Sequence, residues 1–282
     1  MNANTKRFFR TLFGRKIVIV SAVVIAFFML CAIASPLIAT HDPNAQNLSE
    51  SLQGMSKEHW LGTDQFGRDL YSRIVYGARI AFLVGIISVF IAAVIGSIIG
   101  MVAGFFGGWV DQVLMRIIEA IMAIPALILA LALVAMLGRS LMMLTIVLGV
   151  SSIPGFARMM RGQVLTVRDL DYVAASKIRG NSNFVTMIKH ILPNCMSPMI
   201  VIMTQSIGGT ILAEAGLSFL GAGIVPPTAS WGAMVNDGYT YLSSNPLFAL
   251  TPGVAIILLV LAFNLFGDGL RDAMDPRLRD AQ

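Results

Sequence analysis

The stretch Asp171-Tyr-Val-Ala-Ala-Ser-Lys-Ile-Arg-Gly180, which runs on to His190-Ile-Leu-Pro-Asn194, is a polar and mildly basic segment of an otherwise apolar chain. The apolar stretches on both sides of it have the composition of membrane-spanning helices. A polar segment between two such spans must be solvated, and this one is longer than the few residues that most helix connections need. The segment therefore predicts a helical membrane protein with a loop on which a soluble molecule can dock.

The composition is that of a membrane protein. Of the 282 residues, 56% are hydrophobic and only 12% are charged, and the mean hydropathy is +0.79. Roughly 20 apolar residues cross the hydrocarbon core of a bilayer as a helix. Stretches of this kind lie at 17–38, 80–104, 113–137, 141–157, 199–224 and 247–266. Because a bilayer accepts only helices or closed barrels, the chain is predicted to be an all-α integral membrane protein with six transmembrane helices.

Basic residues indicate the orientation. The net charge of +5 is carried at the ends of the spans rather than on one face, which argues against nucleic acid as a partner. Lys and Arg concentrate before the first span, in the loop at about 158–194, and after the last span, where Arg271, Arg277 and Arg279 lie. The positive-inside rule therefore predicts both termini and the loop in the cytoplasm. Arg68 and Arg73 are exceptions, since they fall just before the second span, on the predicted outer side.

The spans divide the chain into five segments. A cytoplasmic N-terminal segment covers 1–16, the first transmembrane helix covers 17–38, and an extracytoplasmic segment covers 39–79. A five-helix core at 80–270 follows, which includes the cytoplasmic loop at about 158–194, and a cytoplasmic tail covers 271–282. In the extracytoplasmic segment, Gly62, Gly67 and other turn-forming residues predict an ordered, compact loop rather than a linker.

Three interpretations of residues 158–194 compete: a solvated connector, a patch for nucleic acid or lipid, and a docking element. The length argues against a simple connector. Tyr172 and Phe184 are too few aromatic residues for a surface on which bases stack. A docking element agrees best with the sequence, because its residues have the pattern of a short, capped helix.

That short helix would begin beside two acids and end at a glycine. Asp169 and Asp171 place negative charge at its N-terminal end, where the helix dipole is positive. The small residues at 174–176 would let a partner approach the backbone, and Gly180 would terminate the helix. A second helix at about 183–191 would then return the chain to the membrane.

Four residues within the spans are candidates for either a polar pathway or helix packing. Pro125 should kink the third span. Gly208 and Gly209 lie in the fifth span, where small residues permit close contact between helices. Glu214 lies toward the outer part of the same span, where it either faces a cavity or joins the packing of the bundle. Packing is the favoured interpretation for all four.

Several kinds of site are not predicted. The sequence has no Gly-x-x-x-x-Gly-Lys-Ser/Thr phosphate loop, so the chain itself should not bind ATP. No catalytic residues and no cofactor are expected, and no metal site is predicted because His41, His59 and His190 are scattered along the sequence. A channel or ion-coupled carrier, the second class of function, would favour charged residues in the middle of spans. Here they lie mainly at the ends.

The docking segment resembles the cytoplasmic loop of permease subunits in binding-protein-dependent ABC importers. That loop reads Glu-Ala-Ala, three residues, Gly, nine residues, Ile, any residue and Leu-Pro. Alignment on Gly180 and Leu192-Pro193 places Ala174 at the Glu position and His190 at the Ile position, so the chain departs from the pattern at both. The absent Glu implies that contact there depends on close backbone packing rather than on a carboxylate.

Further motifs resemble one branch of this family, the C-type permease of dipeptide, oligopeptide and nickel importers. They are His59-Trp-Leu-Gly-Thr-Asp-Gln-Phe-Gly-Arg-Asp69, Ala213-Glu-Ala-Gly-Leu-Ser-Phe-Leu-Gly221 and Phe263-Asn-Leu-Phe-Gly-Asp-Gly-Leu-Arg-Asp-Ala-Met-Asp-Pro-Arg277. The resemblance implies a type I ABC importer permease in the lipid bilayer of a bacterial inner membrane. The implied partners are a homologous B-type permease, two ABC ATPase subunits that bind ATP and Mg, and an extracytoplasmic solute-binding protein.

The resemblance also implies how the loop works. A coupling helix at about 170–179 would insert into a groove on an ATPase subunit, and ATP-driven closure would switch the pathway between inward-open and outward-open states. The residues assigned to this ATPase-coupling loop are Asp171, Tyr172, Ala174, Ala175, Ser176, Lys177, Arg179 and Gly180. Peptides are the predicted cargo, with nickel or a metal chelate as the alternative.

Overall fold

The structure is a computed structural model that describes residues 3–274. Residues 1–2 and 275–282 lie outside this part, and with them Arg277 and Arg279 of the expected tail. Within the described residues the protein is helical, apart from an isolated β-bridge between Thr63 and Asp69. The helices are α1 (Ala3–Leu12), α2 (Lys16–Ile38), α3 (Leu70–Phe106), α4 (Gly108–Met122), α5 (Ala126–Leu137), α6 (Leu141–Val167), α7 (Asp171–Ile178), α8 (Asn183–Thr186), α9 (Leu192–Phe219), α10 (Trp231–Tyr239) and α11 (Pro246–Met274), with a 3₁₀ turn at Leu48–Glu50 and a π-helical turn at Met187–Ile191.

Most of the predicted spans correspond to single long helices. Among the described residues, α2, α3, α6, α11 and the continuous helix Asn183–Phe219, which contains α9, are long and apolar enough to cross a membrane. The pair α4 and α5 makes a sixth crossing if it is counted as one broken span. The prediction of six spans therefore holds on that count.

A sharp break divides the third predicted span. α4 and α5 are bent by 86° relative to each other, which is more than the kink expected at Pro125. Pro125 directly precedes α5 and has extended backbone angles, φ −53° and ψ 130°. Proline has no N–H to continue the hydrogen bonds of α4, and it disfavours helical geometry in the residue before it. Two shorter helices therefore replace the single kinked helix predicted at 113–137.

Glycines bring α3 and α6 into close contact. A Cβ atom on Gly100 would lie 2.2 Å from the backbone oxygen of Ala157, and one on Gly96 would also be too close to α6. Along the same contact, Ser88 Oγ donates a 2.7 Å hydrogen bond to the backbone oxygen of Thr145. Small residues permit this approach where lipid supplies no hydrophobic attraction between helices. We call this contact the glycine seam.

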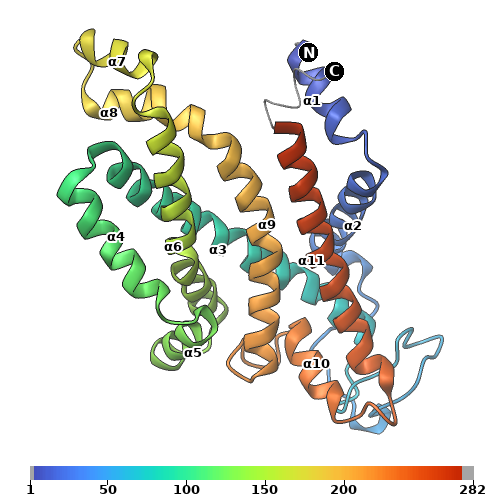
Figure 1. Cartoon of the computed structure of the whole chain (residues 1–282). Helices are drawn as coiled ribbons and strands as arrows, with labels where there is room; N and C mark the ends of the chain where they lie inside the picture. Colours follow the sequence, from blue (N-terminus) through green and yellow to red (C-terminus); the bar gives the residue numbers. More distant parts are fainter. Residues whose placement is uncertain (1–2, 275–282) are drawn as a thin grey trace.

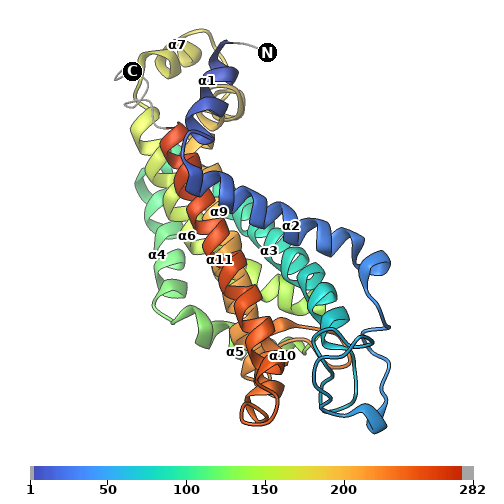
Figure 2. The same cartoon turned by 90° about the vertical axis from the view of Figure 1, so that its right-hand side faces the viewer.

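The two ends of the molecule carry different elements. Figures 1 and 2 both show α1 and α7 at one end, with α8 beside α7 in Figure 1, and both show α10 with the segment between α2 and α3 at the other end. The end of α11 packs against α1 and the start of α2 through a cluster that includes Leu12, Val18, Leu270 and Ala273. The N-terminal helix and the predicted docking loop therefore share one side of the protein, as the distribution of basic residues predicts.

Helix α3 begins at Leu70, earlier than the predicted start at residue 80. The Asp69 carboxylate caps the helix by accepting the Ser72 N–H at 2.7 Å. The preceding segment is compact, as its turn-forming residues predict. Gly67 has a φ of +72°, and a Cβ atom there would lie 1.8 Å from the Asn47 backbone oxygen. Only glycine has both the freedom and the size for this position.

Buried charges anchor the same segment. Arg68 Nε donates to Asp64 Oδ2 at 2.6 Å, and Arg73 Nε lies 3.6 Å from that oxygen. Arg73 also donates to the backbone oxygens of Pro43 and Pro227, at 2.9 and 3.2 Å. Both arginines are buried. They are paired structural groups rather than free surface charges, which accounts for their departure from the positive-inside pattern.

Candidate coupling loop and membrane clefts

The short helix predicted at about 170–179 is present as α7, Asp171–Ile178. No side chain caps its N-terminal end, and Asp171 supplies the acid of its first turn. Gly180 has a φ of +78°, in the left-handed region that glycine adopts without strain. The Gly180 N–H donates to the Lys177 oxygen at 3.0 Å, and the Asn181 N–H donates to the Ser176 oxygen at 3.3 Å. These two bonds form a Schellman motif, so Gly180 ends the helix as predicted.

The inner face of α7 packs on the loop itself. Val173 and Ser176 are buried on this face, since residues three apart on a helix point in similar directions. Ser176 Oγ lies 3.0 Å from Thr186 Oγ1 and accepts a 3.0 Å hydrogen bond from Asn181 Nδ2. The structure thus contradicts the expectation that a partner approaches Ser176, because its side chain joins α7 to α8 instead.

The outer face of α7 is small and apolar. Ala174 and Ala175 are exposed on it. At its end the Ile178 side chain is 87% exposed, and Leu170 and Phe184 add further exposed apolar surface on the same loop. Exposed apolar groups gathered on one loop indicate a surface that another protein covers.

The remaining residues assigned to the coupling loop divide between the protein body and solvent. Lys177 Nζ lies 5.2 Å from the centre of the Phe105 ring, a cation–π contact that joins α7 to the end of α3. Tyr172 is 37% exposed, and its partial burial raises the pKa of its hydroxyl. Asp171 and Arg179 are exposed at the two ends of α7.

Polar contacts hold the loop on the membrane helices. At the end of α6, Arg168 Nη1 donates to the backbone oxygen of Gly104 in α3 at 2.9 Å. Arg161 in α6 makes a two-bond ion pair with Asp111 in α4. Such a forked pair fixes direction as well as distance. The loop therefore extends from a closely tied group of helices, α3, α4 and α6.

The candidate residues in the spans differ in role. Gly208 is buried, and a Cβ atom there would lie 3.2 Å from Phe263 Cβ in α11, which indicates helix packing. Gly209 faces open space. Pro125 lines a cleft of about 420 Å³ between α4, α5, α6 and α9, together with Ser152 and Ser206.

Glu214 is a buried structural acceptor. Its side chain is only 2% exposed. Its Oε1 atom accepts hydrogen bonds from Ser218 Oγ at 2.7 Å and from Ser230 Oγ at 2.9 Å. A buried polar group needs such partners. The favoured interpretation of Glu214 as a packing residue agrees with this geometry.

A second, larger cleft was not predicted from the sequence. It has a volume of about 620 Å³, lies between α6, α9 and α11, and is lined in part by Gln163, Asn194, Ser197, Gln205 and Arg271. A signal was available, because Asn194, Ser197 and Gln205 fall on one face of α9 by their helical spacing. These three side chains are neutral, and therefore do not stand out among the charged residues of the spans.

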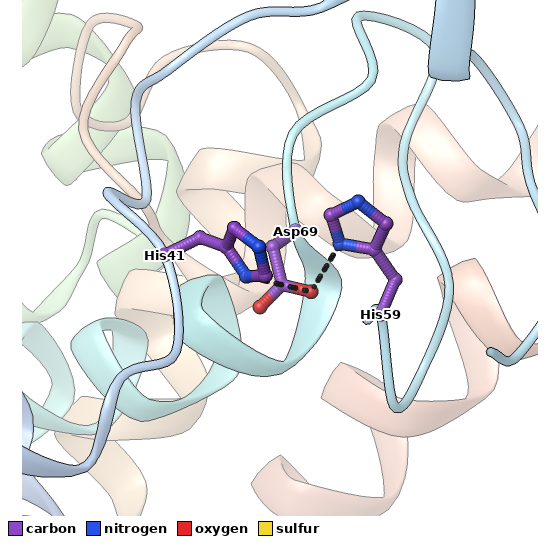
Figure 3. A group of neighbouring side chains, drawn as sticks. All are labelled: His41, His59 and Asp69. Atoms are coloured by element: carbon purple, nitrogen blue, oxygen red, sulfur yellow. Dashed lines mark hydrogen bonds and ion pairs between the residues drawn. The ribbon is translucent and has the colours of Figure 1, made fainter. Parts of the chain in front are cut away.

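The histidines are not all scattered in space. Figure 3 shows His41 and His59 beside Asp69, and these three groups could hold a metal ion. His190 lies in the π-helical turn that precedes α9. Burial acts to raise the pKa of the Asp69 carboxyl, but hydrogen bonds from Ser72 and His59 outweigh it and lower that pKa. The prediction of no metal site assumed that the three histidines lie far apart. The structure removes this reason for His41 and His59, because the fold brings them together.

Comparisons with known proteins agree with the fold. Residues 96–280 match the family of "Binding-protein-dependent transport system inner membrane component". Residues 4–54 match the "N-terminal TM domain of oligopeptide transport permease C". An inward-facing structure of the MetNI methionine ABC transporter is similar, with a TM-score of 0.59 and 21% identity, over 72% of this chain and 96% of that chain. That likeness concerns the fold alone.

Curated relatives cover nearly the whole chain. The dipeptide transport system permease protein DppC of Alkalihalophilus pseudofirmus is 42% identical, over 96% of this chain and 89% of that protein. The probable D,D-dipeptide transport system permease protein DdpC of Escherichia coli K12 is 43% identical, over 94% and 89%. The glutathione transport system permease protein GsiD of Escherichia coli O157:H7 is 39% identical, over 96% and 90%. The ATPase activity of such a transport system resides in subunits separate from the permease. The chain therefore belongs to the family of inner membrane components of binding-protein-dependent transport systems, as a permease subunit.

Proposed function

We propose that this permease carries peptides into the cell, paired with a homologous B-type permease and driven by two ATPase subunits. The three relatives described above are named for dipeptides, D,D-dipeptides and glutathione, which favours peptides over the nickel alternative as the cargo. An extracytoplasmic solute-binding protein would deliver the peptide. This subunit would supply half of the membrane pathway.

The outer face of α7 carries the proposal. Ala174 and Ala175 leave the helix backbone accessible, and Ile178 offers an apolar side chain with no cover in the described chain. We infer that this face docks in a groove on an ATPase subunit, where Ile178 is buried. Closure of the ATPase pair would then move α7 together with α3, α4 and α6 as one body, and so alternate access to the pathway.

Ala175→Arg tests the docking face directly. The arginine adds bulk and charge where the backbone should be approached, so we expect loss of the ATPase subunits on co-purification and loss of peptide uptake. Ser243→Arg is the matched control, because Ser243 is exposed and lies in the turn directly after α10, the helix that Figure 1 shows at the end opposite α7. It should leave both measurements unchanged. Normal ATPase binding by Ala175→Arg would refute docking through this face.

The orientation can be tested by labelling. With Cys31 and Cys195 replaced by alanine, a cysteine at Ser243 should react with an impermeant thiol reagent added outside, and one at Ser182 should not. Both positions are exposed, so reactivity reports the side of the membrane. Labelling at Ser182 alone would reverse the proposed topology.

The cargo is tested by competition. Uptake of a labelled dipeptide by cells that express the complete importer should be reduced by unlabelled dipeptides, and not by Ni²⁺. Deletion of this subunit should abolish the uptake. Uptake of Ni²⁺ that needs this subunit, without peptide uptake, would refute the proposed cargo and leave the permease assignment intact.

A further inference from the structure

Two imidazole rings converge on one carboxylate in the segment between α2 and α3. His41 follows α2, His59 lies in the loop, and Asp69 caps α3, so three stretches of chain meet at this point (Figure 3). His59 Nδ1 lies 2.9 Å from Asp69 Oδ1, and His41 Nδ1 lies 3.9 Å from the same oxygen. The candidate ligand atoms of all three residues lie within 4.8 Å of one another.

These separations suit a small transition-metal ion. Bonds of about 2.0–2.1 Å in tetrahedral geometry place neighbouring ligand atoms roughly 3.3 Å apart. The two distances to Asp69 Oδ1, 2.9 and 3.9 Å, lie on either side of that value. A shift of less than an ångström in each side chain would therefore seat a cation between the three groups.

The two oxygens of Asp69 have separate partners. Oδ2 accepts the Ser72 N–H at 2.7 Å and the Thr40 hydroxyl at 3.2 Å, so this oxygen belongs to the helix cap. Oδ1 is the atom that faces both histidines. The Thr40 hydroxyl also lies 3.0 Å from His41 Nδ1, but it keeps Oδ2 as an acceptor when that nitrogen turns to a metal. A bound cation would thus leave the helix cap intact.

The surroundings have the features of a metal site. Glu50 Oε2 lies 3.6 Å from His59 Nε2, the ring nitrogen that faces away from Asp69. A histidine that binds metal through one nitrogen commonly donates the other N–H to a carboxylate, which fixes its tautomer. His59 and Asp69 are buried, whereas the His41 side chain is 34% exposed and leaves a route for entry.

We propose that His41, His59 and Asp69 form a binding site for a divalent transition-metal ion of the zinc type. Two imidazole nitrogens and one carboxylate oxygen match the ligands of Zn²⁺, with a fourth position left for water on the exposed side of His41. Mg²⁺ and Ca²⁺ prefer sites made of oxygen atoms and should not compete. The ion clips the end of α2 and the loop to the start of α3. It is a structural ion of this subunit and not its cargo.

Zn²⁺ itself is the probe. The permease, purified through a tag without histidine and together with its partner subunits but without the binding protein, is dialysed against Zn²⁺ and its metal content is measured. His41→Asn and His59→Asn should each remove one equivalent of zinc per copy of this chain. His190→Asn is the matched control, because His190 lies far from the cluster in sequence and fold, and it should keep the wild-type content.

Two further measurements keep the result independent of folding. Glu50→Gln retains every ligand and should weaken zinc binding about 10–100-fold, as changes to the partner of a ligating histidine do. Co²⁺ in place of zinc should give a visible absorption band in wild type and in His190→Asn, and not in His41→Asn.

Equal zinc content in wild type and both ligand variants would overturn the proposal. So would wild-type protein that takes up no zinc at this site, in which case the cluster is only a hydrogen-bonded clip. Peptide uptake does not enter either measurement, so failure here leaves the proposed transport function untouched.

Discussion

Replacing Ser176 by alanine should loosen the loop between α6 and α9 without altering the proposed docking face of α7. Thr186 is 0% exposed, and the Ser176 hydroxyl at 3.0 Å is its partner. A buried polar group that loses its partner costs about 1–3 kcal/mol. If α7 opens locally from α8, that cost corresponds to an opening equilibrium about 5–150-fold more favourable.

Hydrogen exchange measures this opening. In the purified complex, backbone amides of α7 and α8 should exchange about 5–150-fold faster in Ser176→Ala than in wild type, because exchange follows the local opening free energy. Adding Thr186→Val removes the orphaned hydroxyl and should bring exchange part of the way back, since replacing both hydroxyl partners by apolar groups is nearly neutral while the part-buried Asn181 Nδ2 still lacks its acceptor. Arg179→Lys, at the exposed end of α7 and outside the proposed docking face, is the control and should leave exchange unchanged.

The result that refutes this reasoning is specific. If Ser176→Ala exchanges like wild type but loses its ATPase subunits, then Ser176 contacts the ATPase directly and the inward placement is wrong. If the double variant exchanges as fast as the single variant, the hydroxyl of Thr186 is not the source of the effect.

Three further changes test the packing of the membrane helices. Gly100→Ala should lower stability by about 1–3 kcal/mol in a thermal unfolding assay, because its Cβ meets a backbone oxygen at 2.2 Å; Gly162→Ala, in open space, should be neutral or stabilising by up to about 1 kcal/mol. Glu214→Gln keeps an acceptor for two buried serines and should preserve uptake, whereas Glu214→Leu should lower the melting temperature; stable Glu214→Gln protein without uptake would place Glu214 in the pathway. Arg73→Met leaves two backbone oxygens without a donor, which costs about 1–3 kcal/mol of stability. A protease should therefore cleave the segment before α3 faster in this variant than in the control Arg79→Met, because the Arg79 side chain is exposed.

The sequence predicts the parts of this protein that depend on local chemistry. The number of spans and their rough positions follow from the apolar stretches, because the bilayer demands them, although α3 begins well before its stretch and α6 ends well after its own. The end of α7 follows from Gly180, because a left-handed residue is needed there. The family also follows, from motifs that keep their order along the chain.

Features that depend on tertiary contact were harder to predict. Ser176 has the same small size as its two alanine neighbours, and only the position of Thr186 decides which face it takes. His41 and His59 are brought together by the fold of the segment between α2 and α3, which no periodicity reveals. The 86° bend at Pro125 exceeds a usual kink, since a proline sets where a helix breaks but not the direction of the next helix.

The glycine seam limits the ways in which force can travel through this subunit. A slip of α3 along α6 by one residue would move side chains by about 1.5 Å, into a contact where even a Cβ atom has no room. The two helices therefore form one rigid unit. The link to α7 lies at one end of this unit, and the buried Asp64–Arg68 pair lies at the other. A displacement of α7 would therefore tilt α3 and α6 together as a rigid body, with little sliding of one helix along the other.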